Sequence, residues 1–261
     1  MKRRIFSELV AGTAIKFLKV LKWKGTEMEV TRDSLLSGAK AAKGTAVIID
    51  VFRAFTCTPL FFSFGVKKAI LVPTPEEAFA LRKENKDLIL SGEIAGVPIE
   101  GFDLGNSPSQ ILKQDPSLFE GKTVVQRSSA GVQGAVTALE AADEVLLCSF
   151  VLAAPTARYI IDRQPRRVSI VAMGRQLKER SPEDEWCATY VSHLLGNGSY
   201  DHNKALREII FHQTTQKFLA PDIQYFPPED PIVCLQRDIF EFALRAKKED
   251  GQVMVRRVDL P

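Results

Sequence analysis

The stretch at residues 45–56, TAVIIDVFRAFT, decides the fold class of this chain. Its apolar run, residues 46–49, is typical of a strand that is covered on both faces, as in a parallel sheet. Asp50 and Arg53 follow directly, so a carboxylate and a guanidinium are expected at the carboxyl end of that strand. Ligands of open α/β sheets bind at this edge. The pair could hold a metal and a phosphate together, or could be only an ion pair that caps the next helix.

Short β-branched runs alternate with helical stretches along the rest of the chain. Strands are predicted at residues 45–50, 69–72, 88–90, 123–126, 145–148 and 168–172, and helices at residues 75–83, 107–113, 131–142, 153–162 and 182–195. This alternation predicts βαβ units and a three-layer αβα fold with a largely parallel or mixed sheet. Segments 44–72 and 121–148 share the order strand, polar turn, helix and strand, as any two βαβ units would.

The composition is that of an ordinary folded protein. Of the 261 residues, 45% are hydrophobic and 26% charged, which excludes a disordered or fibrous class. The net charge of +3 is too small to indicate a nucleic-acid partner. The four cysteines form no CxxC pair, so neither a zinc site nor a disulfide framework is expected.

The amino-terminal residues 1–27 are predicted to be an extension, and residues 28–261 a single α/β domain. Charged residues such as Glu8 and Lys16 interrupt the apolar stretch at residues 5–23, so it is neither a membrane span nor a signal peptide. A basic amphipathic helix on a membrane surface is the alternative interpretation. We therefore expect a cytoplasmic protein without a membrane partner, and we leave open whether it is a homodimer.

Three further polar clusters follow predicted strands. Gly92-Glu93 and the segment GFDLGNSP at 101–108 come after the third strand, where glycines permit close approach of a ligand or simply form a turn. The segment QRSSAG at 126–131 combines two hydroxyls, an arginine and a helix start, which suits an anion cradle or an ordinary helix cap. Glu183 and Asp184 open a later helix, where acids also complement the helix dipole.

Several familiar chemistries are excluded by their missing motifs. The chain has no DxD after its first strong strand, no Cys followed six positions on by Arg, and no GxxxxGK[ST], GxSxG or GxGxxG. The three histidines, His193, His202 and His212, have no clustered partner in the sequence and are predicted to be structural.

In combination, these motifs resemble the 2-phosphosulfolactate phosphatase family. The pattern of that family is a strand ending in IDVxRA[ST]T, then GE, GFDLGNSP, a Thr-rich NG turn, GSF and a SxED helix start. The matching segments here are IIDVFRAFT (48–56), SGE (91–93), GFDLGNSP (101–108), VVQRSSAG (124–131), CSF (148–150) and SPEDEWCA (181–188), and PIVCLQRDIF (231–240) resembles the carboxyl-terminal strand of the family. The likeness spans residues 28–240.

The resemblance implies Mg²⁺-dependent hydrolysis of the phosphate ester of a small sulfonated hydroxy acid, in the metabolism that leads to coenzyme M. We expect Asp50, Glu93 and Asp103 to hold Mg²⁺, and Asp50 or Asp184 to orient the attacking water, although direct attack by Asp50 is the alternative. The residues expected to bind the phosphate and the acid group are Arg53, Asn106, Arg127, Ser128, Ser129 and Gly131. Arg53 is also expected to be catalytic by stabilising the charge of the transition state, so that Arg53→Ala abolishes hydrolysis and leaves the thermal midpoint nearly unchanged. We expect Asp50, Arg53, Glu93, Asp103 and Ser128 to converge on one cleft.

The chain departs from the family pattern at the expected anion pocket. Arg127, Ala130 and Val132 stand where the pattern favours Thr, Asn and Thr, and RQLKER at 175–180 replaces a glycine-rich stretch. These departures leave the physiological ester open. There are two competing interpretations. The protein could be a relative that binds phosphorylated metabolites without turnover, or a structural or regulatory module that keeps only the fold.

Overall fold

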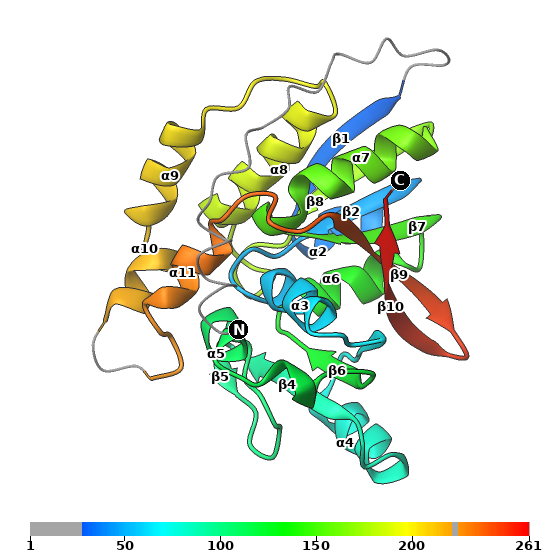
Figure 1. Cartoon of the computed structure of the whole chain (residues 1–261). Helices are drawn as coiled ribbons and strands as arrows, with labels where there is room; N and C mark the ends of the chain where they lie inside the picture. Colours follow the sequence, from blue (N-terminus) through cyan, green and yellow to red (C-terminus); the bar gives the residue numbers. More distant parts are fainter. Residues whose placement is uncertain (1–27, 221–223, 261) are drawn as a thin grey trace.

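The structure is a computed structural model and describes residues 28–220 and 224–260. One ten-stranded mixed sheet runs through it, in the order β1-β8-β2-β7-β9-β10-β3-β6-β4-β5 (Figure 1). The strands are β1 (Glu29–Ser34), β2 (Thr45–Ile49), β3 (Lys68–Leu71), β4 (Ile89–Ile94), β5 (Val97–Pro98), β6 (Thr123–Arg127), β7 (Glu144–Cys148), β8 (Arg167–Ala172), β9 (Phe242–Glu249) and β10 (Gln252–Asp259).

Helices interleave with these strands along the chain. The α-helices are α2 (Leu35–Ala41), α3 (Ala54–Ser63), α4 (Pro75–Glu84), α5 (Pro108–Leu112), α6 (Gly131–Ala138), α7 (Ala153–Arg163), α8 (Pro182–Leu194), α9 (His202–Ile210), α10 (Gln213–Gln216) and α11 (Glu229–Cys234). Short 3₁₀ turns are η1 (Pro116–Leu118), η2 (Phe150–Leu152) and η3 (Lys217–Leu219). None of the helices in the described part of the chain has the length and apolar character that crossing a bilayer requires.

The sheet consists of two parallel blocks joined by the β9–β10 hairpin. Strands β1, β8, β2 and β7 are parallel, as are β3, β6 and β4. The hairpin pairs antiparallel with β7 on one side and with β3 on the other. The chain passes between the blocks twice, from β2 through α3 to β3 and from β6 through α6 to β7. The beginnings of α3 and α6 are thereby brought close together.

The fold has three layers, with helices on both faces of the sheet. One apolar core joins α2, α3 and α6 to the facing side chains of both blocks, and Figure 1 shows α3 and α6 between the blocks. A second core packs α7 and α8 against the other face of the first block, and a third packs α4 against the second block. Alternate residues of β2 serve different cores, since Ile48 belongs to the first and Ile49 to the second.

Helix α3 is apolar and buried along most of its length, although it contains Pro59. A proline inside a helix has no N–H to offer the carbonyl four residues earlier. That carbonyl, of Phe55, instead accepts a hydrogen bond from Ser149 Oγ at 3.0 Å. Ser149 is the serine of the CSF segment, so this motif satisfies the backbone of α3.

The structure confirms the predicted three-layer αβα class and each of the strands and helices predicted from residue 45 onward, with shifts of a few residues at their ends. One expectation is wrong: PIVCLQRDIF is not a strand, because α11 occupies residues 229–234 and β9 begins at Phe242. The predicted extension, residues 1–27, lies outside the described residues.

Candidate active site

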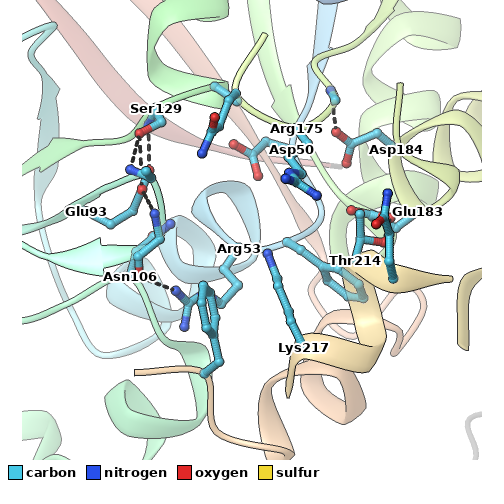
Figure 2. Close-up of a pocket in the computed structure, with 18 residues that line it drawn as sticks. Asp50, Arg53, Glu93, Asn106, Ser129, Arg175, Glu183, Asp184, Thr214 and Lys217 are labelled. Atoms are coloured by element: carbon cyan, nitrogen blue, oxygen red, sulfur yellow. Dashed lines mark hydrogen bonds between the residues drawn. The ribbon is translucent and has the colours of Figure 1, made fainter. Parts of the chain in front are cut away.

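A pocket of about 410 Å³ opens where the ends of several strands of both blocks meet (Figure 2). Acidic side chains on its wall are Asp50, Glu93, Glu183 and Asp184, and basic ones are Arg53, Arg175 and Lys217. The other residues that line it are Phe52, Ala95, Gly96, Asn106, Ser129, Ala130, Gly174, Gln176, Gln213, Thr214 and Phe226. The pocket is therefore strongly polar and carries both signs of charge.

Asp50 lies between the beginnings of α3 and α6. Its Oδ2 accepts a hydrogen bond from the backbone N–H of Gly131 at 2.7 Å, and its Oδ1 accepts one from Ala54 at 3.3 Å. A Cβ on Gly131 would lie 2.6 Å from Asp50 Oδ2, so only glycine allows this approach. Burial raises the pKa of Asp50 to about 7, and the charges of Glu93 and Glu183 add to the rise.

Glu93 is held by the turn that follows β6. Both the backbone N–H and the hydroxyl of Ser129 donate to its carboxylate, and so does the backbone N–H of Gly96. The N–H groups of Ser129 and Gly131 thus donate to Glu93 and Asp50, and the N–H of Val132 donates to Ser128 Oγ. The turn predicted to cradle a phosphate holds two of the protein's own carboxylates. Its role in binding phosphate stays a prediction.

Glu183 and Asp184 belong to the first turn of α8. Asp184 accepts hydrogen bonds from the backbone N–H groups of Val51 at 2.7 Å and Gly174 at 2.8 Å, so it joins two strand ends. Glu183 accepts one from Thr214 Oγ1 at 2.8 Å. Burial raises the pKa of both carboxyls, and their mutual repulsion raises that of Asp184 further.

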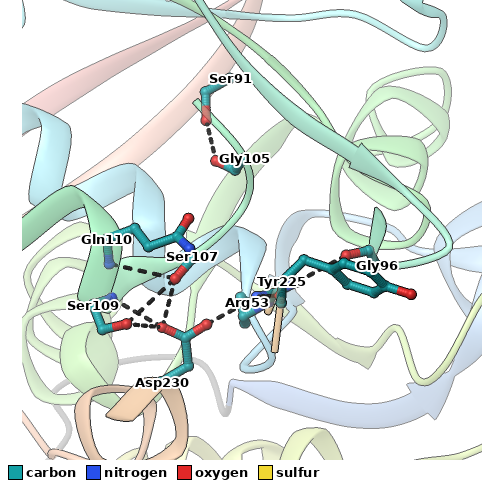
Figure 3. A network of polar contacts seen from close by, with 9 residues as sticks. All are labelled: Arg53, Ser91, Gly96, Gly105, Ser107, Ser109, Gln110, Tyr225 and Asp230. Carbon is teal, nitrogen blue, oxygen red and sulfur yellow. Dashed lines mark hydrogen bonds and ion pairs between the residues drawn. The ribbon is translucent and has the colours of Figure 1, made fainter. Parts of the chain in front are cut away.

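Arg53 lines the pocket but is engaged in a buried network (Figure 3). Its Nη1 donates to Asp230 Oδ2 at 2.8 Å and to the carbonyl of Tyr225 at 2.8 Å, while Nη2 donates to the carbonyl of Gly96 at 3.2 Å. Asp230 is fully buried and also accepts hydrogen bonds from the hydroxyls of Ser107 and Ser109. Arg53 thus joins the loops around Gly96 and Tyr225 at the pocket.

Several pocket residues were not found from the sequence. Arg175 lies after β8, and Thr214 and Lys217 belong to α10 and η3, which no motif indicated. Asp230, the partner of Arg53, does not line the pocket; it lies in α11, directly before the segment 231–240 that was expected to be a strand. The only available signal was weak: RQLKER, which contains Arg175, departs from the family pattern at this end of the sheet. Glu183 had been noted as an acid at a helix start, without a role.

The structure places the other expected site residues as follows. Asn106 lines the pocket, and its buried Oδ1 has no hydrogen-bond partner in the described part of the chain. Asp103, expected with Asp50 and Glu93, is not in the pocket lining, because its carboxylate bonds to Arg82 and to the backbone N–H of Leu90. Arg127 donates to the carbonyl of Glu93, and the Ser128 hydroxyl bonds within its own turn. The expected convergence thus holds for Asp50, Arg53 and Glu93 and is wrong for Asp103 and Ser128.

The carboxylates of the pocket suit a hard cation in part. Within residues 28–220 and 224–260, no group of three His, Cys, Asp or Glu side chains is arranged to hold a metal ion by itself. Mg²⁺ usually keeps several waters and takes one or two carboxylates together with substrate phosphate oxygens. Asp50 and Glu93 line one pocket, and the negative charge of Glu93 contributes to the raised pKa of Asp50. This donor chemistry fits that mode of Mg²⁺ binding.

The raised pKa values predict how stability depends on pH. Asp50, Glu183 and Asp184 bind protons more tightly in the folded than in the unfolded chain. Without divalent cations, the free energy of unfolding should therefore fall as the pH rises from 3.8, the ordinary pKa of an aspartate, to about 7, the raised pKa of Asp50. Urea unfolding in EDTA between pH 5 and pH 7 measures this slope.

The matched variant for this prediction is Asp50→Asn, which should show a shallower fall of the free energy of unfolding over the same pH range. A wild-type protein whose stability rises over this range would contradict the prediction.

A polar pocket at strand ends, in a sheet covered by helices on both faces, is typical of α/β enzymes that bind small ligands. Comparison with known proteins identifies the enzyme family. Residues 31–248 match the family model described as 2-phosphosulpholactate phosphatase. The chain therefore belongs to the 2-phosphosulfolactate phosphatase family and is a phosphoric monoester hydrolase by class.

Curated relatives bear the same description. A protein of Bacillus subtilis named probable 2-phosphosulfolactate phosphatase is 31% identical over 210 residues, which are 79% of this chain and 88% of the relative. Similarly named proteins of Deinococcus radiodurans and Caldicellulosiruptor saccharolyticus are 34% and 37% identical, over 62% and 58% of this chain and 66% and 62% of their own lengths.

Proposed function

We propose that this protein hydrolyses the phosphate ester of a small acid in a Mg²⁺-dependent reaction, with 2-phosphosulfolactate as substrate and sulfolactate and phosphate as products. The observation that carries the proposal is the pocket itself, in which four buried carboxylates face three cationic side chains, in a chain that matches the family over residues 31–248. The names of the relatives supply the candidate substrate. A cytoplasmic location and a place in coenzyme M synthesis stay predictions.

Asp50 and Glu93 would hold the cation. Both are anchored by backbone N–H groups, which fixes their carboxylates before a ligand arrives. When bound, Mg²⁺ would offset the negative charge of the phosphate and of the departing oxygen. Asn106 adds an amide whose buried oxygen has no hydrogen-bond partner in the described chain, so it could accept one from a bound water or hydroxyl.

In the proposed reaction, the oxygen of a water attacks phosphorus, the ester P–O bond breaks and the departing alkoxide takes up a proton. A buried carboxylate of the acidic wall would orient the water and accept its proton. Asp184 was expected in this role, but it already accepts two backbone N–H bonds. Burial raises the pKa of its neighbour Glu183, which strengthens that carboxylate as the base that accepts the proton.

The test is a panel of phosphate esters assayed with Mg²⁺ and with EDTA. The panel contains 2-phosphosulfolactate, phosphoglycolate, glycerol 2-phosphate and p-nitrophenyl phosphate. We expect release of phosphate from the acidic esters, with Mg²⁺ only, and the highest kcat/KM on 2-phosphosulfolactate. Binding of these esters without any turnover would instead support the non-catalytic relative, and turnover that is equal in EDTA would remove Mg²⁺ from the proposal.

A further inference from the structure

We propose that Lys217 and Arg175 form a second anion subsite, which recognises the carboxylate or sulfonate of the substrate while the phosphate lies at the acidic wall with its cation. The inference rests on the proposed phosphatase function, and it adds the residues that select an acidic ester over a neutral one. Both side chains line the pocket, and in Figure 2 the Lys217 amine and the Arg175 guanidinium point into the same central space.

Arg53 is the third cation of the pocket, but its charge is already paired. Asp230, fully buried, lies 2.8 Å from Arg53 Nη1, and two backbone carbonyls accept its other hydrogen bonds. The rings of Phe218 and Phe226 also cover the guanidinium. Because the charge of Asp230 neutralises that of Arg53, this buried ion pair offers little net positive charge to a ligand. Arg53 shapes the pocket, and the free positive charge must come from the other two cations.

Lys217 is half-buried and makes no ion pair with any residue of the described chain. Its amine is 5.1 Å from the ring centre of Phe218 and 4.6 Å from that of Phe226, so the aromatic faces hold it in place without neutralising it. Burial lowers the pKa of Lys217, the nearby charges of Arg53 and Arg175 lower it further, and the charges of Glu183 and Glu93 oppose the shift. The amine thus lies among charges of both signs but is paired with none of them, so it can bind an anion.

Arg175 is available for the same ligand. Its only carboxylate partner among the described residues is Glu179, at 3.8 Å and four residues along the chain, and both side chains are largely exposed. Such exposed pairs are weak and are easily exchanged for a better partner. A guanidinium matches the planar oxygens of a carboxylate and can also bond two oxygens of a sulfonate.

The acidic side chains of the pocket and its two free cations, Lys217 and Arg175, differ in what they can bind. The acidic wall, with Asp50, Glu93 and Glu183, repels a bare anion and requires a cation between itself and a phosphate. Lys217 and Arg175 can bind an anion directly. A small molecule that carries a phosphate and a second acid group can reach both the acids and these cations, because the pocket of about 410 Å³ is of the size that holds one small ligand.

The test compares Lys217→Met with the wild type on an acidic and a neutral ester, phosphoglycolate and glycerol 2-phosphate. Methionine keeps an unbranched side chain against Phe218 and Phe226 but carries no charge. We expect the ratio of kcat/KM for the acidic ester to that for the neutral ester to fall by about 10- to 100-fold, the effect of losing one charge-assisted hydrogen bond. Lys217→Arg should restore part of the ratio.

The control is Lys204→Met, which removes an exposed lysine that also lies over an aromatic ring, that of Trp186, outside the pocket. This variant should keep the wild-type ratio. If Lys217→Met lowers kcat/KM equally for both esters, Lys217 binds the phosphate and the subsite proposal is overturned, while the phosphatase function stands.

Binding of the product separates failure of this proposal from failure of the proposed function. Calorimetric titration with sulfolactate and, separately, with inorganic phosphate requires no turnover. We expect the Kd of sulfolactate to rise by about 10-fold or more in Lys217→Met, with a much smaller change for phosphate. An unchanged Kd for sulfolactate would overturn the subsite even in a protein that hydrolyses no ester.

Discussion

Asp50→Asn is expected to lower kcat/KM for the acidic phosphate ester by at least about a hundredfold. Loss of groups that only support a metal ligand typically costs 10- to 100-fold, and Asp50 is proposed to be a ligand itself. Asparagine has nearly the same shape but brings one carbonyl oxygen where Asp50 offers two, to the N–H groups of Gly131 and Ala54. Its neutral side chain would bind Mg²⁺ weakly, so the Mg²⁺ concentration for half-maximal activity should rise as well.

The fold should tolerate this substitution. The ionised carboxyl of Asp50 is costly to bury, as its raised pKa shows, so removing the charge offsets the loss of one hydrogen bond. We expect a thermal midpoint within a few degrees of the wild type. Asp143→Asn is the matched control, because Asp143 is exposed at the opposite end of the first block, before β7. If the Asp50→Asn enzyme keeps more than about a third of the wild-type kcat/KM, Asp50 has no essential role in the reaction.

Arg53→Ala is expected to destabilise the protein strongly. The substitution leaves Asp230, which is fully buried, without its positive partner. Breaking a buried ion pair by removing one member typically costs about 3–5 kcal/mol, because the remaining charge is not compensated. For a domain of this size the thermal midpoint should fall on the order of 10 °C. Thermal unfolding followed by circular dichroism measures the fall.

Three further variants serve as comparisons for the thermal midpoint of Arg53→Ala. Asp230→Asn should cost less stability than Arg53→Ala, since it leaves a cation at the edge of a pocket instead of an enclosed anion. Arg53→Lys keeps the charge and should recover part of the midpoint. Arg256→Ala breaks an exposed ion pair with Glu249 and should hardly change the midpoint. A midpoint of Arg53→Ala equal to that of the wild type would show that the buried pair contributes nothing to stability.

The expectation from sequence for Arg53 was that it binds phosphate without affecting stability. Nothing near Arg53 in the chain indicates otherwise, because its partner Asp230 lies 177 positions away. Asp230 itself lies in α11, directly before the segment 231–240 that was expected to be a strand. Sequence reasoning therefore recognised that Arg53 lies at the pocket but could not recognise that its charge is already paired.

The same limit explains Asp103 and the turn at residues 128–131. The motif GFDLGNSP places Asp103 and Asn106 three residues apart, yet the Asp103 carboxylate bonds to Arg82 while Asn106 lines the pocket. The turn has the free N–H groups of a helix start, as predicted, but the anions that occupy two of them come from Asp50 and Glu93. Which anion meets a helix start depends on the packing of other strands.

The sequence by itself determined the main strands and helices of residues 45–195 and the edge at which the site lies. A short continuous apolar run such as TAVII, followed by polar residues, is typical of a covered strand with the polar residues at its end, and both properties follow from local spacing. Only the tertiary structure decided that the β9–β10 hairpin joins two parallel blocks. It also decided that Lys217 lines the pocket and that Asp103 does not. These outcomes depend on pairing between residues far apart in the chain, which leaves no trace in local patterns of hydrophobicity or charge.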